Sequence, residues 1–364
     1  KDGRIIAVGR ESEVANLAGP GTVTHNMHGR FIMPGLVDSH THALWGACRD
    51  LFDVYVGYAA SFADLLEAAA ARARQLPAGN PISGGPWRPA MRHDMGANPK
   101  AILDQISTDH PIILADTSQH LLWCNSTALD LAGIPRETEI AGGVIERLPS
   151  GEPNGMLAES AGAPVWQLLG RTPKQLERAS KEFVQRFNAY GITAFKEPAA
   201  FEADLQAYQA ADQRHELTLH MAAHIVRQSP MSVEPICYDT MDRLRRTYAS
   251  TNVRTNFAKL FLDGVAPGHT ASFIAPYLAS SGYDVANHEP DATLLLAPDL
   301  LNETVCELDA RGFTVKMHAV GDNALRKGLD DAWHCKCNRP DEQHGGRLGP
   351  LAGVDHGPCS ILHC

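Results

Sequence analysis

The chain has 364 residues, of which 44% are hydrophobic, so it can bury a large core as one α/β barrel or as two ordinary domains. It carries 32 Lys and Arg against 42 Asp and Glu, a formal net charge of -10, and no dense basic run of the kind that binds phosphates. We therefore expect no nucleic-acid partner. No uninterrupted apolar stretch of about 18 residues or more occurs either, so we expect no membrane partner and a cytoplasmic location. The chain starts at Lys1 without a methionine, and we allow for an incomplete N-terminus.

Residues 1–35 alternate short β-type runs with Gly and Pro turns. Such a pattern predicts a few strands of a small sheet. The runs cover residues 4–8, 23–27 and 30–33. We interpret residues 1–35 as part of a small β-sandwich domain.

From residue 36 onward, apolar strand-like runs alternate with helical patterns, which predicts repeated βα units and a parallel sheet. Five strands are expected, at residues 36–41, 191–196, 217–226, 256–263 and 313–318. The expected fold class is therefore α/β, a TIM-type (β/α)8 barrel over residues 36–333, incomplete in this chain. Gly- and Pro-rich turns interrupt the rhythm at about residues 79–159, which we interpret as an insertion after the first barrel strand.

The tail, residues 334–364, differs in composition from the rest of the chain. Gly, Pro, His and Cys replace an amphipathic pattern, and about 46 residues after His318 are too few for three more βα units of a barrel of roughly 250 residues. We interpret the tail as aberrant and outside the native fold, with the reading frame lost near Trp333. A zinc cluster of Cys335, Cys337, Cys359 and Cys364 is the less favoured alternative, because Cys-x-x-Cys knuckles are absent.

His40 and His42 are the first candidate metal ligands. Two residues apart on a strand, their side chains point to the same face, toward the end of the barrel where active sites gather. A Pro34-Gly35 turn precedes the apolar strand, which ends in Asp38 and the two histidines. This context is much rarer than a bare histidine pair and favours a site for one cation.

The segment Pro34-Gly-Leu-Val-Asp-Ser-His-Thr-His42 resembles the first-strand metal motif of the amidohydrolase superfamily. Lys259-Leu-Phe-Leu-Asp-Gly264 resembles the fourth-strand lysine segment of that superfamily, and His318-Ala-Val-Gly-Asp322 resembles its fifth-strand histidine. The insertion, with Ser83-Gly-Gly-Pro-Trp87 and the run from Gln119 to Leu129, is similar to the branch that contains N-substituted formamide deformylase. The likeness covers roughly residues 1–333.

The resemblance implies a metal site made by His40, His42, Lys259 and His318. An ammonium group has no lone pair, so Lys259 would act as a carbamate formed with carbon dioxide, which can bridge two divalent ions. A lysine at such a position is otherwise a snorkelling or salt-bridged residue. Lys196 is the rival bridging lysine, with an ion pair to the adjacent glutamate as its ordinary role.

Several other residues have two interpretations. Asp263 and Asp322 are either acceptors that fix the tautomers of ligand histidines or carboxylates that cap loops. Trp87 and His120 are the candidate substrate-binding residues, with core packing as the alternative for an aromatic side chain in an insertion. The remaining histidines with strand or loop context are interpreted as core residues: His220, His224 and His269.

The implied function is metal-dependent hydrolysis of non-peptide C–N bonds, of amide or N-formyl type, in a small-molecule substrate. One or two divalent ions, expected to be zinc, lower the pKa of bound water to about 7. The sixth-strand histidine and eighth-strand aspartate of the family are not found, so we assign no general base and expect the chain to be catalytically impaired. The alternatives are a silent metal-binding fragment and an isomerase or lyase on the same barrel. A homodimer is one option for the oligomeric state.

Overall fold

The computed structural model describes residues 5–232, 234–337 and 360–363. The chain divides into two compact units, Lys1–Gly35 and Leu36–Cys364, which are described separately.

In the first unit, the described residues 5–35 contain a short helix α1 (Glu11–Val14) and one 3₁₀ turn (Ala15–Leu17), and no strand. The strands predicted at residues 23–27 and 30–33 are therefore wrong. A strand needs a hydrogen-bonded partner, and apolar side chains such as Phe31 and Ile32 stay exposed, at 85% and 69%. Membership of a β-sandwich remains a prediction.

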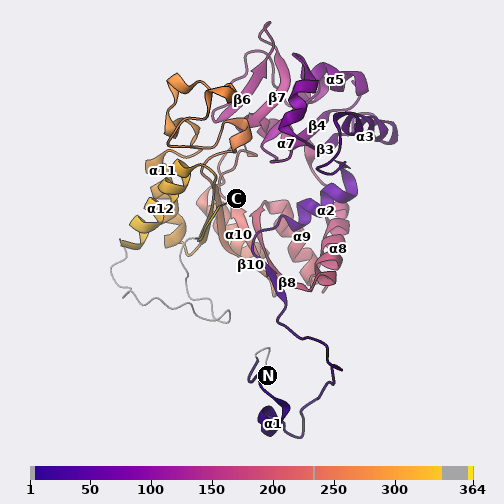
Figure 1. The fold of residues 1–364 in the computed structure, drawn as a ribbon, viewed down its shortest axis with the longest axis vertical. Helices are drawn as coiled ribbons and strands as arrows, with labels where there is room; N and C mark the ends of the chain where they lie inside the picture. The colour runs from indigo at the N-terminus through magenta and orange to yellow at the C-terminus, as the bar shows by residue number, and fades with distance from the viewer. Residues whose placement is uncertain (1–4, 233, 338–359, 364) are drawn as a thin grey trace. The chain divides into compact units, whose positions relative to one another are not determined.

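The second unit is built on a parallel sheet that contains all five predicted strands. Its order is β1 (Leu36–Asp38), β8 (Ile192–Ala200), β9 (His220–Val226), β10 (Val253–Phe261), β11 (Thr314–Ala319) and β12 (Ser360–His363). Every neighbouring pair is parallel. The sheet curls, with helices along its outer side (Figure 1), an α/β barrel-like arrangement. The sixth strand, β12, comes from the tail, whose remaining residues 338–359 and 364 lie outside the described part.

Six helices belong to this sheet: α2 (Ala43–Phe52), α8 (Pro173–Ala189), α9 (Glu202–Gln213), α10 (Tyr238–Tyr248), α11 (Pro298–Ala310) and α12 (Asp322–Cys337). Local sequence explains where the longest of them, α8, begins. For α8, Thr172 accepts a hydrogen bond from the backbone N–H of Gln175 in a capping box, and Pro173 stands at the first helical position. Leu176, Ala179 and Phe183 are buried at helical spacing against the sheet.

A second, mixed sheet lies above the first in Figure 1. Its order is β2 (Val54–Tyr55), β3 (Ile82–Trp87), β4 (Ile112–Asp116), β5 (Leu121–Cys124), β7 (Pro153–Glu159) and β6 (Gly143–Arg147). The helices around it are α3 (Phe62–Gln75), α4 (Arg92–Met95), α5 (Pro99–Ile106), α6 (Ser126–Leu131) and α7 (Ala163–Trp166). The insertion thus begins by residue 54, earlier than the predicted residue 79. The short strand β2 and the helix α3 have the same local pattern as a βα unit of the barrel, so the sequence did not distinguish them from one.

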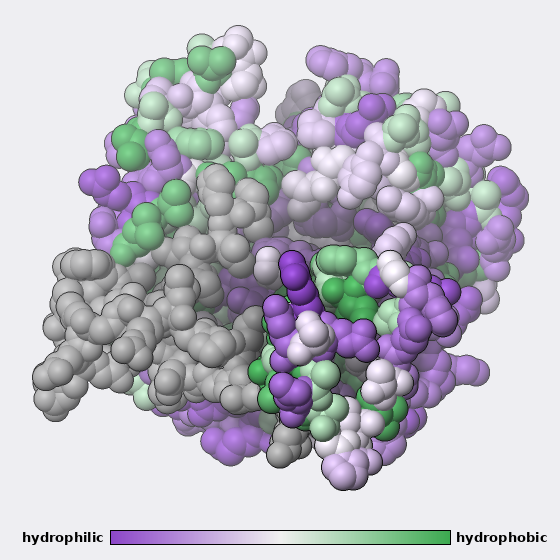
Figure 2. Space-filling view, turned by 60° about the horizontal axis from the view of Figure 1, so that its bottom comes forward, coloured by the Kyte–Doolittle hydropathy of each residue, from purple (hydrophilic) through white to green (hydrophobic). Residues whose placement is uncertain are grey.

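Single 3₁₀ turns occupy the loops of both sheets, at Pro89–Met91, Ser160–Gly162, Gln167–Leu169, Ala266–Gly268, Ala279–Ser281, Val285–Asn287 and Pro290–Thr293. Within the described residues, no helix combines the length and the apolar character that a membrane crossing needs. On the face drawn in Figure 2, hydrophilic residues cover much of the described surface and hydrophobic ones lie between them in small groups.

Asn125 joins three segments of the insertion. Its side-chain oxygen accepts hydrogen bonds from the backbone N–H groups of Ile112 and Ala128, each 2.9 Å long. Its amide nitrogen donates to the carbonyl oxygens of Ser107 and His110, also at 2.9 Å. The residue is fully buried, so these backbone groups have no access to water as a replacement partner.

We expect Asn125→Ala to lower the free energy of unfolding by about 2–4 kcal/mol, because it leaves buried backbone groups unpaired and removes the cap of α6. Chemical denaturation followed by circular dichroism measures the change. Asn188→Ala, which removes one exposed hydrogen bond to Thr218, is the matched control and should cost about 0.5 kcal/mol or less. Equal effects of the two substitutions would contradict the assigned role of Asn125.

Candidate functional site

His40 and His42 follow the first barrel strand directly. β1 ends at Asp38, whose carboxylate accepts a hydrogen bond of 3.0 Å from the backbone N–H of His40. His42 is the residue before helix α2. The two imidazole rings lie 5.8 Å apart between centroids, edge to face. The predicted pair is therefore brought together by the turn between strand and helix and not by the strand itself.

A buried carboxylate orients His42. Nδ1 of His42 lies 3.0 Å from Oε1 of Glu197, whose side chain is 1% exposed. The second oxygen of Glu197 accepts a 2.7 Å hydrogen bond from the hydroxyl of Tyr208, and the ring of Trp45 stacks on His42 at 5.0 Å. With the Nδ1 proton donated to Glu197, the Nε2 lone pair of His42 is available for a cation, the arrangement found around many metal-bound histidines.

An ion pair with Glu197 was the ordinary alternative for Lys196, and Glu197 pairs with His42 instead. The two residues are neighbours on β8, so their side chains point to opposite faces of the sheet. Glu197 faces His42, while Lys196 is half-buried and acts electrostatically on His224. The signal in the sequence was a carboxylate in a strand whose other residues, apart from Thr193 and Lys196, are apolar.

Two buried lysines lie side by side at the end of the parallel sheet. Lys259 on β10 is 3% exposed and stands in register with Lys316 on β11, which is fully buried. Nζ of Lys259 lies 4.7 Å from the ring centroid of Phe261, and Nζ of Lys316 donates to the carbonyl of Ser39 at 3.2 Å. Lys316 was missed in the sequence, although it lies two residues before His318 on the same strand.

The positive charges of the two lysines contribute to a low pKa of His40. Burial, followed by the charges of Lys316 and Lys259, lowers the pKa of His40 from 6.5 to about 4. The ring is therefore neutral at pH 7 and keeps a lone pair, which a metal ligand requires.

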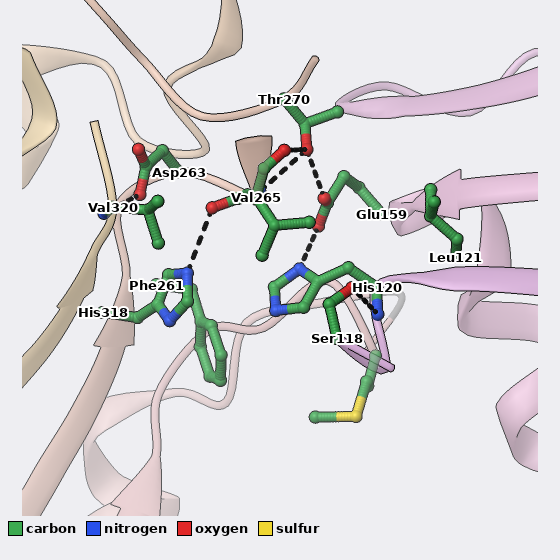
Figure 3. A network of polar contacts seen from close by, with 12 residues as sticks. Ser118, His120, Leu121, Glu159, Phe261, Asp263, Val265, Thr270, His318 and Val320 are labelled. Atoms are coloured by element: carbon green, nitrogen blue, oxygen red, sulfur yellow. Dashed lines mark hydrogen bonds and ion pairs between the residues drawn. The ribbon is translucent and has the colours of Figure 1, made fainter. Parts of the chain in front are cut away.

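His318 lies on β11, 6% exposed, where the barrel meets the insertion (Figure 3). Its ring centroid is 5.4 Å from that of Phe261 and 5.2 Å from that of His120. Nε2 lies 3.2 Å from the carbonyl oxygen of Gly264, which places the ring proton there and the lone pair on Nδ1. Burial is the largest cause that lowers the pKa of His318, to about 3, and the nearby charge of Lys259 contributes.

The types of side chain present suit a divalent cation, but the arrangement of the described residues does not form a ligand set. Among the described residues, no three His, Cys, Asp or Glu side chains converge as a metal-holding group. The charge of Lys259 nevertheless acts on His40 and on His318, and the ring of His42 lies beside that of His40. A fourth ring, that of His224, is fully buried, and its Nε2 has no hydrogen-bond partner among the residues that the structure describes. Neutral imidazole rings are ligands that divalent transition metals accept, so the donor types fit such an ion.

The two aspartates considered as acceptors for ligand histidines, Asp263 and Asp322, bind backbone groups. Asp263 is fully buried and accepts hydrogen bonds of 2.8–2.9 Å from the N–H groups of Ser272, Val320 and Gly321. Burial raises the pKa of its carboxyl group, against these hydrogen bonds. Asp322 is exposed at the start of α12 and accepts from the N–H of Ile274 at 2.8 Å. Both structural contacts correspond to the loop-capping alternative.

Trp87 does not line the site, so its predicted role in substrate binding is wrong. Its side chain is fully buried in the core of the insertion, and its indole N–H donates to the carbonyl of Leu114 at 2.9 Å. Trp123 is in the same core and donates to the carbonyl of Pro99 at 3.0 Å. A Gly-Gly turn before an aromatic residue could not distinguish a pocket wall from a core.

His120 is the predicted substrate residue that reaches the barrel. Nδ1 of His120 lies 2.8 Å from Oε2 of Glu159, and Oε1 of Glu159 accepts from the hydroxyl of Thr270 at 2.5 Å (Figure 3). Glu159 ends β7 of the insertion, whereas Thr270 follows β10 of the barrel. Glu159 and Thr270 were missed, because no local pattern links residues 111 positions apart.

The tail residues named from the sequence lie outside the side chains that the structure describes: Trp333, Cys335, Cys337, Cys359 and Cys364. The interpretation of His220 as a core residue is wrong, because it is exposed on β9, whereas His269 contacts Tyr277 and Tyr283 in a loop.

The neutral state of His224 predicts a pH dependence of stability. Nδ1 of this ring bonds the carbonyl of Glu197 at 2.8 Å, and burial, then the charge of Lys316, lowers its pKa from 6.5 to about 3. The unfolded chain takes up this proton near pH 6.5 and the folded chain does not. The contribution is therefore fully present above about pH 6.5 and is lost as the pH falls toward the folded pKa.

We expect the free energy of unfolding to fall by about 2 kcal/mol on account of His224 between about pH 6.5 and about pH 4.5. Urea denaturation across this range, of the wild-type chain and of His224→Asn, measures the difference between their slopes. Identical slopes would show that His224 does not carry this effect.

Gly321 allows the loop after β11 to approach the loop after β10. A Cβ atom at Gly321 would lie 1.9 Å from the carbonyl oxygen of Ser272, so Gly321→Ala forces the two loops apart. We expect a loss of about 2–4 kcal/mol in the free energy of unfolding. Gly46→Ala, in helix α2 with no atom near the added Cβ, should stabilise the chain by up to about 1 kcal/mol. Calorimetric melting of both variants tests the contrast, and a tolerated Gly321→Ala would contradict it.

Several known proteins are similar to this chain in sequence. The putative amidohydrolase YtcJ of Bacillus subtilis (strain 168) is 26% identical over 342 residues, which cover 91% of this chain and 61% of that protein. N-substituted formamide deformylase of Arthrobacter pascens is 28% identical over 279 residues, 73% of this chain and 50% of that protein. The chain thus spans between half and two thirds of the length of these relatives.

The fold has a counterpart among solved structures. An uncharacterized metal-dependent hydrolase from Pyrococcus horikoshii OT3 superposes with a TM-score of 0.57 at 19% identity, over 83% of this chain and 56% of that one. A model of the amidohydrolase family matches residues 24–350, most of the chain. This match, together with the parallel sheet and the histidines at its end, shows that the chain belongs to the amidohydrolase family.

Proposed function

We propose that this chain carries the metal site of a hydrolase that cleaves non-peptide C–N bonds, of amide or N-formyl type, in small molecules. The observation that carries the proposal is the pair His40 and His42 directly after β1, together with the charge of the buried Lys259 acting on both His40 and His318. Family membership supports the reaction class, and the relative named N-substituted formamide deformylase supports the bond type.

In this proposal His42 presents Nε2 and His318 presents Nδ1 to one or two divalent ions, with zinc as the expected metal. When bound, the ion supplies a Lewis acid and lowers the pKa of water toward neutrality. Glu197 holds the proton on Nδ1 of His42 and so keeps its opposite nitrogen as a ligand. Lys259 joins as a carbamate: its neutral amine adds to carbon dioxide and releases one proton, which converts a repelling cation into an anion.

The remaining parts of the site act on the substrate. His120, which extends from the insertion toward His318, contacts the substrate at the boundary between the two sheets. The buried Phe261 and the insertion exclude water from the same region. Low water content strengthens every charge interaction there.

Metal analysis and an amide assay test the proposal. We expect the chain purified with zinc to hold one or two ions. Hydrolysis of an N-alkylformamide or a cyclic amide should be slow, because no general base is assigned, and it should be lost on chelation and restored by zinc. His42→Ala and Glu197→Gln should weaken zinc binding, the latter by about 10–100-fold, because the proton of His42 is no longer fixed. His220→Ala removes an exposed histidine of the same sheet and is the control.

Fewer than one ion per chain, or zinc binding that is insensitive to His42→Ala, would refute the metal site. Stoichiometric zinc without turnover of any amide would instead identify a silent metal-binding fragment. Turnover of a lactone alone would favour another reaction on the same barrel.

A further inference from the structure

The side chain of Glu159, at the end of β7 in the insertion, contacts both His120 and Thr270 of the barrel. One of its oxygens accepts from Nδ1 of His120 at 2.8 Å, and the other accepts from the hydroxyl of Thr270 at 2.5 Å. The Glu159 side chain is 1% exposed and that of His120 is 11% exposed. Figure 3 shows His120 extending from the insertion strands toward His318 on the barrel.

The surroundings of Glu159 are shaped to hold this carboxylate. Its backbone adopts φ +52°, an uncommon conformation for a residue other than glycine. A Cβ atom on Gly264 would lie 2.2 Å from Oε1 of Glu159, so only glycine leaves room for the carboxylate. The carbonyl of the same Gly264 binds Nε2 of His318. The contacts of Glu159, Thr270 and Gly264 therefore link His120 to the histidine on β11.

The carboxylate also decides which atom of His120 faces the site. A carboxylate only accepts hydrogen bonds, so the neutral ring carries its proton on Nδ1 and a lone pair on Nε2. The second oxygen of Glu159 is occupied by Thr270, which keeps the carboxylate from turning. His120 is thereby a positioned acceptor beside His318, and a substrate group that meets it must donate a hydrogen bond.

We propose that Nε2 of His120 accepts the N–H of the scissile amide, so that the site selects secondary amides, and that Glu159 is the positioning residue for this contact. The inference rests on the proposed hydrolase function and names its substrate class. A carbonyl oxygen cannot pair with the lone pair of Nε2, whereas the N–H of a mono-substituted amide can. An N-methylated amide leaves this acceptor without a donor, and sites built on such a hydrogen bond discriminate strongly against substrates that lack it.

The experiment compares an N-alkylformamide with its N-methyl counterpart in the zinc-loaded full chain. We expect the wild-type chain to favour the secondary amide in kcat/KM by about 10-fold or more. His120→Ala and Glu159→Gln should lower kcat/KM more for the secondary amide than for the N-methyl amide, so the ratio falls toward one. Glu159→Gln preserves volume, so its effect reports the hydrogen bond and not the room around the ring.

A control variant and an intermediate variant help to interpret the result. Glu146→Gln alters a glutamate of the same sheet that pairs with Arg92 at the surface, and it should leave the ratio unchanged. Thr270→Val removes the hydroxyl that restrains Glu159 and should lower the ratio less than Glu159→Gln. If His120→Ala does not fold, Glu159→Gln and Thr270→Val carry the test alone.

Equal kcat/KM for both amides in the wild-type chain, or a ratio that survives Glu159→Gln, would overturn the inference while the hydrolase function stands. Absence of turnover of both amides in the wild-type chain would overturn the proposed function. In that case the dissociation constants of the two amides, measured by calorimetry on the zinc-loaded chain, still test the inference. Equal affinities would refute it, and tighter binding of the secondary amide that Glu159→Gln removes would support it.

Discussion

The parallel pairing of β10 with β11 is the constraint on which the site depends. It places Lys259 opposite Lys316 and Phe261 opposite His318, so two ammonium groups and an imidazole share one end of the sheet. Burying these groups is unfavourable unless each finds a partner. The carbonyl groups of Ser39 and Gly264 supply two of the partners, and the neutral forms of His40 and His318 avoid further positive charge.

Two buried carboxylates orient two of the histidines, one from the barrel and one from the insertion. Glu197 of the barrel orients His42, and Glu159 of the insertion orients His120. Each carboxylate is buried and has its second oxygen bound to a hydroxyl, from Tyr208 and from Thr270. The two pairs thus follow one design, in which a fixed Nδ1 proton leaves Nε2 as an acceptor. In our proposals one acceptor serves the metal and the other the substrate.

The insertion therefore also positions a side chain of the candidate site. Its own core, with Trp87, Trp123 and the hydrogen bonds of Asn125, makes it a rigid support. The insertion positions the side chain of His120 at the end of the barrel sheet, where His318 lies. Rigid support of this kind is what a site needs when it must place a hydrogen bond within a fraction of an ångström.

The sequence alone was sufficient for the five parallel strands and for the proximity of His40 and His42, because strand periodicity and the turn before His40 are local patterns. Lys259 and His318 were singled out by the family resemblance, and their role as ligands remains a proposal. Only the tertiary structure decided which carboxylate meets which histidine, that Trp87 belongs to a core, and that Lys316 lies beside Lys259. These depend on contacts between residues far apart in the chain, such as His42 with Glu197, 155 positions away. The expected N-terminal strands failed for the same reason: a strand exists only with a partner, and local patterns do not contain one.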